Sequence, residues 1–194
     1  MSRNLLPGKW ETERLKVVDS TLDEVRELQQ INDAVPQTQS WTRVEGEDEP
    51  DYPMLSALKE GVLPPTPNKS KEFFRLQSIR MRSSDELIGF LGVYHGFPND
   101  DIFWINTLTL LPKFQGKSYG TELMMGLSKI VKQLESYTRM RTYVPLTNWP
   151  SLRLCVKAGL NKMVEIAGDK VHSDKAEAHV LLERSFIEPT GRGQ

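Results

Sequence analysis

The chain has 194 residues, of which 38% are hydrophobic and 26% are charged, and its formal net charge is −1. This composition fits one globular domain and excludes a disordered chain. The balanced charge gives no sign of a nucleic-acid-binding face, and no apolar run is long enough for a membrane helix. The single cysteine, Cys155, cannot form an internal disulfide, and the first ten residues lack a signal-peptide pattern, so we expect a cytoplasmic protein.

The first part of the chain predicts a strand, a helix and a long surface excursion. Residues 13–18 have the apolar and β-branched character of a strand. Thr21 and Glu24 have the spacing of a capping box, and apolar residues at helical spacing continue through about Asn32. Residues 44–72 are rich in acids and prolines, which predicts a surface excursion with a short helix at 54–60.

The rest of the chain alternates strands and helices. Strands at 73–81, 87–94 and 102–111, joined by short turns, predict an antiparallel meander. An amphipathic helix follows, with an apolar stripe from Leu123 to Leu134. The remaining elements are predicted as a strand at 138–144, a helix at 150–158 ended by Gly159, and strands at 160–166 and 178–186.

This order predicts an α/β fold with a mixed, mostly antiparallel sheet of six to seven strands and about four helices. The long helix should form a right-handed crossover, so the strands before and after it should be parallel. We expect a single domain over residues 1–194, with its core at about 13–186 and a loose tail at 187–194.

The loop between the third meander strand and the long helix has the features of a phosphate-binding site. Gly116, Ser118 and Gly120 are small, so a ligand can approach the unpaired N–H groups of the helix start. Four lysines and one glutamate between Lys113 and Lys132 give a local balance of +3. A P-loop is disfavoured because Leu111 occupies the position of its first glycine, and the dinucleotide-binding G-x-G-x-x-G fingerprint is absent. The remaining alternative is a loop whose glycines only make a tight turn.

The segment Gln115 to Gly120 resembles the acyl-CoA-binding motif Q/R-x-x-G-x-G/A of the GNAT superfamily of N-acetyltransferases. Ser118 stands where the family usually has its first glycine. The residues before the loop, Leu108 to Pro112, resemble the family's L-x-V-x-P approach strand, whose backbone pairs with the pantetheine arm. The resemblance therefore implies acetyl-CoA as co-substrate, with a cofactor-binding set of Leu108, Thr109, Leu110, Gln115, Gly116, Lys117, Ser118, Tyr119, Gly120 and Thr121.

Two further segments resemble this family. Asn148 to Leu160 is similar to its N-x-x-S-x-x-[VL]-x-x-K-x-G-F segment, which adds Asn148 and Ser151 to the residues implied to face the cofactor arm. Residues 12–15, Thr-Glu-Arg-Leu, look like the T-E-R-L start of the branch that acetylates ribosomal-protein N-termini. The resemblance covers about residues 13–186 and implies a GNAT-like fold.

The catalytic groups are less well marked. The strand at 102–111 lacks the carboxylate that orders a water in many relatives. His95 is a candidate base, with a solvated turn histidine as the alternative; His172 and His179 are weaker candidates. Cys155 occupies the position where many relatives have a tyrosine, so it is a candidate acid, with a buried packing residue as the alternative. The three histidines and one cysteine do not form a metal-binding set.

The leading functional hypothesis is direct transfer of an acetyl group from acetyl-CoA to a primary amine of a small molecule or a protein N-terminus. The alternative is a non-catalytic acyl-CoA-binding or sensing protein of the same fold. We expect a monomer or homodimer. The acidic stretch at 45–51 either attracts a cationic acceptor or is a solvated loop. An acceptor pocket lined by aromatic residues would draw on Trp41, Tyr52, Trp104 and Trp149.

Overall fold

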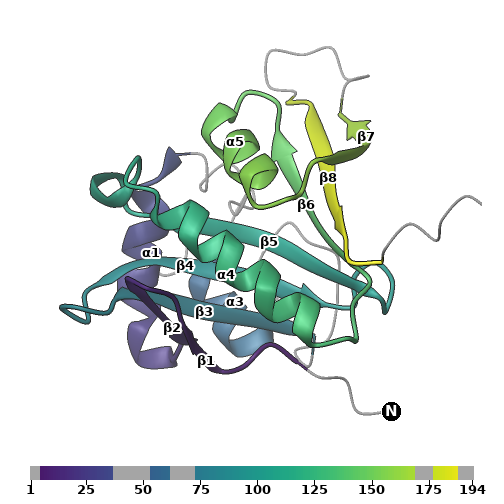
Figure 1. Cartoon of the computed structure of the whole chain (residues 1–194). Coiled ribbons are helices and arrows are strands. Elements are labelled where there is room, and N and C mark those ends of the chain that lie inside the picture. The colour runs from purple at the N-terminus through teal and green to yellow at the C-terminus, as the bar shows by residue number, and fades with distance from the viewer. Residues whose placement is uncertain (1–4, 37–52, 62–72, 169–176, 188–194) are drawn as a thin grey trace, which may run out of the picture. The chain divides into compact units, whose positions relative to one another are not determined.

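The structure is a computed structural model that describes residues 5–36, 53–61, 73–168 and 177–187 (Figure 1). Its α-helices are α1 (Val25–Asp33), α3 (Met54–Glu60), α4 (Tyr119–Gln133) and α5 (Trp149–Lys157), with two 3-10 turns at Leu22–Glu24 and Pro112–Phe114. Its strands are β1 (Lys9–Glu11), β2 (Leu15–Asp19), β3 (Phe74–Met81), β4 (Leu87–His95), β5 (Ile102–Leu110), β6 (Arg139–Pro145), β7 (Lys162–Ala167) and β8 (His179–Ser185).

The described strands pair in the order β1-β2-β3-β4-β5-β6-β8-β7. The α/β class and the mixed, mostly antiparallel sheet are confirmed, as are the four α-helices among the described residues. β5 and β6 are parallel, with Ile102 opposite Arg139, which confirms that the strands before and after the long helix run in the same direction. Most boundaries lie within one or two residues of the prediction.

The prediction of six to seven strands is too low, because the described residues alone form a sheet of eight. The missed strand, β1, has three residues and pairs antiparallel with β2. Only Trp10 of this strand is buried, and its indole Nε1 donates to Gln77 Oε1 at 2.8 Å. A three-residue strand is too short to show the period-two pattern that identifies strands in a sequence.

The chain forms two compact units. The first unit comprises Pro7–His95 and Ile105–Leu123, and the second comprises Met1–Leu6, Gly96–Trp104 and Met124–Gln194. β5 and α4 each contribute residues to both units. The phosphate-binding loop and the N-terminal strands therefore belong to the first unit, whereas α5 belongs to the second.

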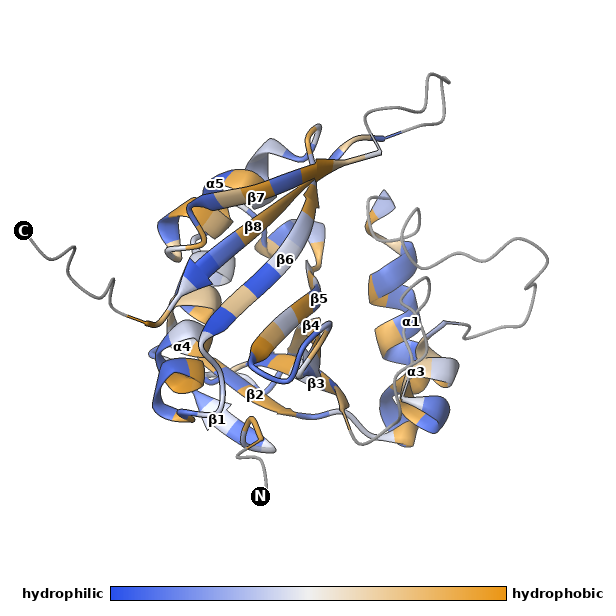
Figure 2. Cartoon of the chain, turned by 90° about the vertical axis from the view of Figure 1, so that its right-hand side faces the viewer, coloured by the Kyte–Doolittle hydropathy of each residue, from blue (hydrophilic) through white to orange (hydrophobic). Residues whose placement is uncertain are grey.

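The core of the first unit is built around β4. From Ile88 to His95 every residue of this strand is buried, so both of its faces are covered, and its residues read as an almost continuous apolar run. α1 packs against β4 and α3, and both helices lie on the same side of β2, β3 and β4 (Figures 1 and 2). The predicted link between Thr21 and Glu24 is present, because Glu24 Oε2 accepts from the Thr21 N–H at 2.9 Å.

In the second unit, β8 lies between β6 and β7 (Figure 1), and α5 ends as predicted at a glycine. Gly159 has a φ of 89°, in the left-handed region that favours glycine. The Leu160 N–H donates to the Cys155 carbonyl at 2.9 Å, and the Gly159 N–H donates to the Val156 carbonyl at 3.0 Å. These two bonds are those of a Schellman cap, which satisfies carbonyls that the helix end leaves unpaired.

Several predicted features lie outside the described residues. They are the acidic stretch at 45–51, Trp41, Tyr52, His172 and most of the tail. Within the described ranges, no helix is both long and apolar enough to cross a membrane.

Candidate acyl-CoA site

The backbone of the loop between β5 and α4 is left-handed at two residues. After β5 ends at Leu110, a 3-10 turn with proline at its start leads into the loop. Gly116 has a φ of 73° and Ser118 a φ of 66°. Both values lie in the left-handed region, where glycine is free of the Cβ clash that other residues suffer. This conformation explains why the acyl-CoA-binding motif that the loop resembles has a glycine at the position of Ser118.

The loop presents a row of N–H groups without protein acceptors. Within the described part of the chain, no backbone N–H from Gly116 to Thr121 donates to a protein group. Gly116, Lys117 and Ser118 are exposed, and a Cβ at Gly116 would meet no atom within 4 Å. Because the start of α4 also carries the positive end of the helix dipole, the loop fits an anion such as a pyrophosphate.

The loop is tied to β5 through Gln115. Its Nε2 donates to the Leu110 carbonyl at 2.7 Å, so this side chain fixes the turn that follows the strand. Within the first unit β5 is the edge of the sheet, and an edge strand presents unpaired main-chain groups. The Leu110 carbonyl already accepts from Gln115, so the main chain at Leu108 and the Leu110 N–H are the groups that can pair with an extended ligand such as a pantetheine arm.

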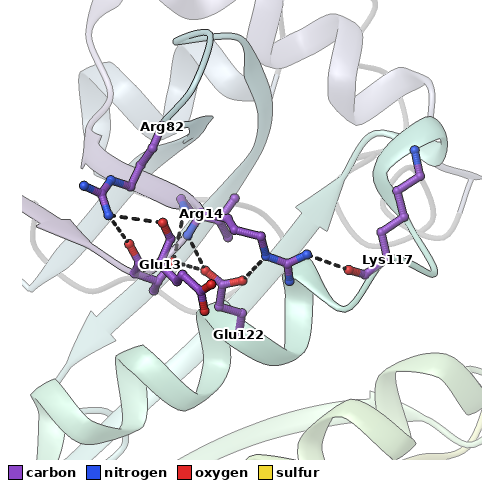
Figure 3. Close-up of polar contacts among 7 residues, drawn as sticks. Glu13, Arg14, Arg82, Lys117 and Glu122 are labelled. Carbon is purple, nitrogen blue, oxygen red and sulfur yellow. Dashed lines mark hydrogen bonds and ion pairs between the residues drawn. The ribbon is translucent and has the colours of Figure 1, made fainter.

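A carboxylate in the first turn of α4 joins the N-terminal segment to the loop (Figure 3). Glu122 Oε1 accepts from the Thr12 hydroxyl at 2.5 Å and from the Arg14 backbone N–H at 2.8 Å. Glu122 Oε2 accepts from Arg14 Nε at 2.6 Å. Partial burial alone would raise the pKa of Glu122, but these hydrogen bonds and the Arg14 charge outweigh it and hold the pKa below its ordinary value.

The second unit places Asn148 and Ser151 at the start of α5. Asn148 is the N-cap residue, and its side-chain oxygen accepts from the Ser151 backbone N–H at 3.2 Å. This bond satisfies one of the N–H groups that a helix start leaves unpaired. The motif that resembles the GNAT family's segment thus has a local structural role in addition to the implied contact with the cofactor arm.

Cys155 lies on the buried face of α5, with 3% of its surface exposed. Burial raises the pKa of its thiol to about 12, because the charged thiolate loses its hydration. A thiol with so high a pKa is a weak proton donor to a leaving thiolate. The position and the pKa therefore support the packing alternative for this residue.

His95 ends β4 and is buried, with 1% of its surface exposed. The alternative of a solvated turn histidine is therefore wrong, because the strand extends through this residue. Its ring Nδ1 lies 3.1 Å from the Phe73 carbonyl oxygen. A carbonyl only accepts, so Nδ1 carries the hydrogen of this contact, and in the neutral tautomer the lone pair lies on Nε2.

The two described tryptophans of the predicted acceptor pocket have different surroundings. Trp104 is buried and makes edge contacts with Phe97 and Tyr143, at centroid distances of 5.2 and 5.4 Å. Trp149 is 66% exposed. His179 begins β8. Among the described residues, no group of three His, Cys, Asp or Glu side chains could hold a metal ion.

The contact between Glu122 and the N-terminal segment was not predicted from the sequence. Residues 12–15 are singled out by the family resemblance, but no periodicity connects them to a glutamate 108 residues further along the chain. The available signal was the position of Glu122 as the only acid near the helix start, where a carboxylate has a favourable interaction with the helix dipole.

Comparisons with known proteins agree with this fold and loop. The model of the acetyltransferase (GNAT) family matches residues 32–160, and no curated protein matches the chain. An acetyltransferase (GNAT family) from Bacillus anthracis superposes with a TM-score of 0.70 at 14% identity, covering 93% of this chain and 99% of that one. A candidate ribosomal-protein-serine acetyltransferase from Vibrio cholerae has a TM-score of 0.68 at 17% identity, with coverages of 95% and 99%.

A third similar structure contains ligands. Spermidine N-acetyltransferase from Vibrio cholerae, in complex with CoA and spermine, has a TM-score of 0.68 at 12% identity, covering 88% of this chain and 95% of that one. At these identities the structures establish the shared fold, and the family model matches well over half of the chain. The protein belongs to the acetyltransferase (GNAT) family.

Proposed function

We propose that this protein transfers an acetyl group from acetyl-CoA directly to a primary amine. The observation that carries the proposal is the loop segment at 116–121, whose backbone N–H groups have no protein acceptor among the described residues, in a chain that belongs to the GNAT family. Acetyl-CoA supplies an acetyl group activated as a thioester.

The residues proposed to hold acetyl-CoA divide into three groups. The loop N–H groups and Ser118 would bind the pyrophosphate. The main chain of β5 around Leu108 and Leu110 would pair with the pantetheine arm. Asn148 and Ser151, at the start of α5, stay in the proposed cofactor-binding set because of the family motif that they resemble. Much of the rate enhancement would come from this positioning, with a backbone N–H near Leu110 stabilising charge on the carbonyl oxygen.

The acceptor must be neutral before it can attack. At pH 7 neutralising a lysine-like amine costs roughly 4–5 kcal/mol, whereas an α-amine costs only about 1 kcal/mol. β5 has no carboxylate to order a water as base, and its polar residues are Asn106, Thr107 and Thr109. We therefore favour an acceptor whose amine has a low pKa, such as a protein or peptide N-terminus. His95 stays a candidate base through its Nε2 atom.

A non-catalytic acyl-CoA-binding or sensing role is the second candidate. Two observations favour it: β5 lacks a carboxylate, and the thiol of Cys155, at the position where many relatives have a tyrosine, has a pKa of about 12. Neither observation concerns cofactor binding. The enzyme and the sensor would therefore bind acetyl-CoA at the same site, and only the enzyme would turn it over.

Calorimetry with acetyl-CoA tests the binding step. We expect a saturable isotherm in the micromolar range, and absence of binding at millimolar acetyl-CoA would refute both candidate functions.

A thiol-release assay then separates the enzyme from the sensor. The amine panel contains a serine-initiated peptide, its N-terminally blocked form with one internal lysine, spermidine and free amino acids. Turnover with the first peptide but not the blocked one supports an α-amine acceptor. Binding without turnover across the panel supports the sensor.

The single-domain organisation, the cytoplasmic location and a monomeric or homodimeric state stay predictions from the sequence. Light scattering of the purified protein with and without acetyl-CoA measures the oligomeric state directly.

A further inference from the structure

Arg14 contacts both the carboxylate of Glu122 and the phosphate-binding loop itself. Its guanidinium donates through Nε to Glu122 Oε2 at 2.6 Å, and a second guanidinium nitrogen donates to the Lys117 carbonyl at 3.3 Å (Figure 3). The same group lies over the ring of Tyr119, 4.3 Å from its centroid. One side chain thus holds the loop at Lys117, at Tyr119 and at the first turn of α4.

These contacts fix the part of the backbone that must bind the ligand. Lys117 and Tyr119 flank Ser118, which is held at a φ of 66°, a conformation that is unfavourable for a non-glycine residue. A strained loop persists only where surrounding contacts determine it. Because ordering a loop during binding reduces affinity, a loop ordered in advance binds more tightly.

Arg14 also removes an electrostatic conflict. Glu122 lies in the first turn of α4 with 17% of its side chain exposed, and an unpaired carboxylate there would compete with a pyrophosphate for the positive end of the helix. The Arg14 guanidinium neutralises this carboxylate. The loop therefore keeps its attraction for an anion although an acid lies within the first turn.

We propose that Arg14 is a positioning residue for the diphosphate of acyl-CoA, acting through the Lys117 carbonyl, the Tyr119 ring and the Glu122 carboxylate. The proposal rests on the proposed acyl-CoA binding and assigns a role to the N-terminal Thr-Glu-Arg-Leu segment in that binding. Arg14 acts through the loop, so its replacement should weaken ligands that contain the diphosphate and spare those that lack it.

Arg82 provides a matched control. It donates to the Thr12 and Glu13 carbonyls at 3.0 and 3.1 Å and pairs with Glu11 at 3.3 Å, so it holds the same N-terminal segment. It has no described contact with the loop at 115–121. Arg82→Ala therefore loosens the segment without removing the contacts assigned to Arg14.

The experiment measures dissociation constants of the full chain for acetyl-CoA and for S-acetylpantetheine, which lacks the diphosphate and the nucleotide. We expect Arg14→Ala to weaken acetyl-CoA binding about tenfold and to leave S-acetylpantetheine binding within about twofold. Arg14→Lys keeps the positive charge beside Glu122 but not the planar, forked geometry of the guanidinium. Its affinity for acetyl-CoA should therefore lie between that of the wild type and that of Arg14→Ala. Arg82→Ala should bind both ligands like the wild type.

Three results would overturn the proposal: acetyl-CoA binding unchanged in Arg14→Ala, an equal loss for both ligands, or the same loss in Arg82→Ala. Circular dichroism establishes that each variant is folded, and Arg14→Lys serves as the test if Arg14→Ala is not. A wild-type protein that binds no acetyl-CoA refutes the proposed function instead, so the two failures are distinguishable.

Discussion

At Ser118 the backbone and the side chain have opposite requirements. The φ of 66° favours glycine, whereas a hydroxyl beside the helix start can donate to a phosphate oxygen. We predict that Ser118→Gly stabilises the protein by about 0.5–1 kcal/mol, because relief of the strain exceeds the entropy that glycine adds to the unfolded chain. Chemical denaturation measures this difference.

Ser118→Ala separates the two contributions, since alanine keeps the Cβ and removes the hydroxyl. If the hydroxyl binds phosphate, both variants should lose acetyl-CoA affinity by the same factor, about five- to tenfold. If only Ser118→Ala loses affinity, relief of the backbone strain in Ser118→Gly offsets the loss of the hydroxyl. If neither variant loses affinity, the hydroxyl does not bind phosphate.

Burial makes Cys155 a sensitive probe of this part of α5. A rise of its pKa from 9.0 to about 12 reduces the thiolate fraction at pH 8 about a thousandfold. We predict that an aromatic disulfide reagent labels the folded protein at least two orders of magnitude more slowly than the denatured chain. Because the chain has one cysteine, the released chromophore reports this site alone, and rapid labelling of the folded protein would contradict the assigned burial.

Two glycines of the first unit differ in the space around them. A Cβ at Gly89 would lie 2.1 Å from the Thr109 carbonyl oxygen and 2.7 Å from the Leu110 side chain, so β4 and β5 approach closely where the cofactor arm is proposed to pair. We predict that Gly89→Ala destabilises the protein by about 1–3 kcal/mol and weakens acetyl-CoA binding. Denaturation and calorimetry measure the two effects.

Gly116→Ala is the control for this prediction. Its Cβ would meet no atom within 4 Å, so the substitution costs only the left-handed backbone conformation, about 1 kcal/mol. Equal destabilisation by the two substitutions would show that the close approach of β4 and β5 is not the limiting contact.

The link between the N-terminal segment and α4 should depend on pH. The pKa of Glu122 is lower in the folded protein than its ordinary value, so its stabilising contribution is present above about pH 4.3 and is lost as the pH falls through the lowered pKa. We predict that Glu122→Gln is less stable than the wild type by about 1 kcal/mol at pH 7 and that the difference shrinks in acid. Denaturation at several pH values measures it.

Glu86 provides the comparison for this experiment. Its pair with Lys113, at 2.7 Å, is exposed on both sides, and exposed pairs contribute little to stability. Glu86→Gln should therefore change the free energy of unfolding by less than about 0.5 kcal/mol. If Glu122→Gln were less stable than the wild type by the same free energy at every pH, the charge of the carboxylate would not be what holds the N-terminal segment.

For the whole molecule, acetyl-CoA should act as a stabiliser. A ligand at a hundred times its dissociation constant adds about 2.7 kcal/mol to the stability of the folded state, which raises the midpoint temperature of a chain of this size by roughly 5–10 °C. Thermal unfolding with acetyl-CoA and with unacylated CoA tests this. The proposed diphosphate site predicts similar shifts for both ligands, and no shift with either would contradict it.

The sequence was sufficient for most elements because their patterns are long. The stripe from Leu123 to Leu134 and the apolar run of β4 are stronger signals than the three residues of β1, whose place in the sheet depends on a partner strand. The sequence also predicted the phosphate-binding loop, but it did not predict the left-handed φ of Ser118. The contact of Arg14 with Glu122 joins distant parts of the chain, and no local rule predicts such a contact.

The contact between Arg14 and Glu122 also has a consequence for how the protein is made. During synthesis Arg14 leaves the ribosome more than one hundred residues before Glu122, and closing so long a loop is slow relative to forming local contacts. Arg14 can therefore order the phosphate-binding loop only after α4 has formed. In refolding experiments, the ability to bind acetyl-CoA should then appear with the last kinetic phase, after most of the secondary structure has formed.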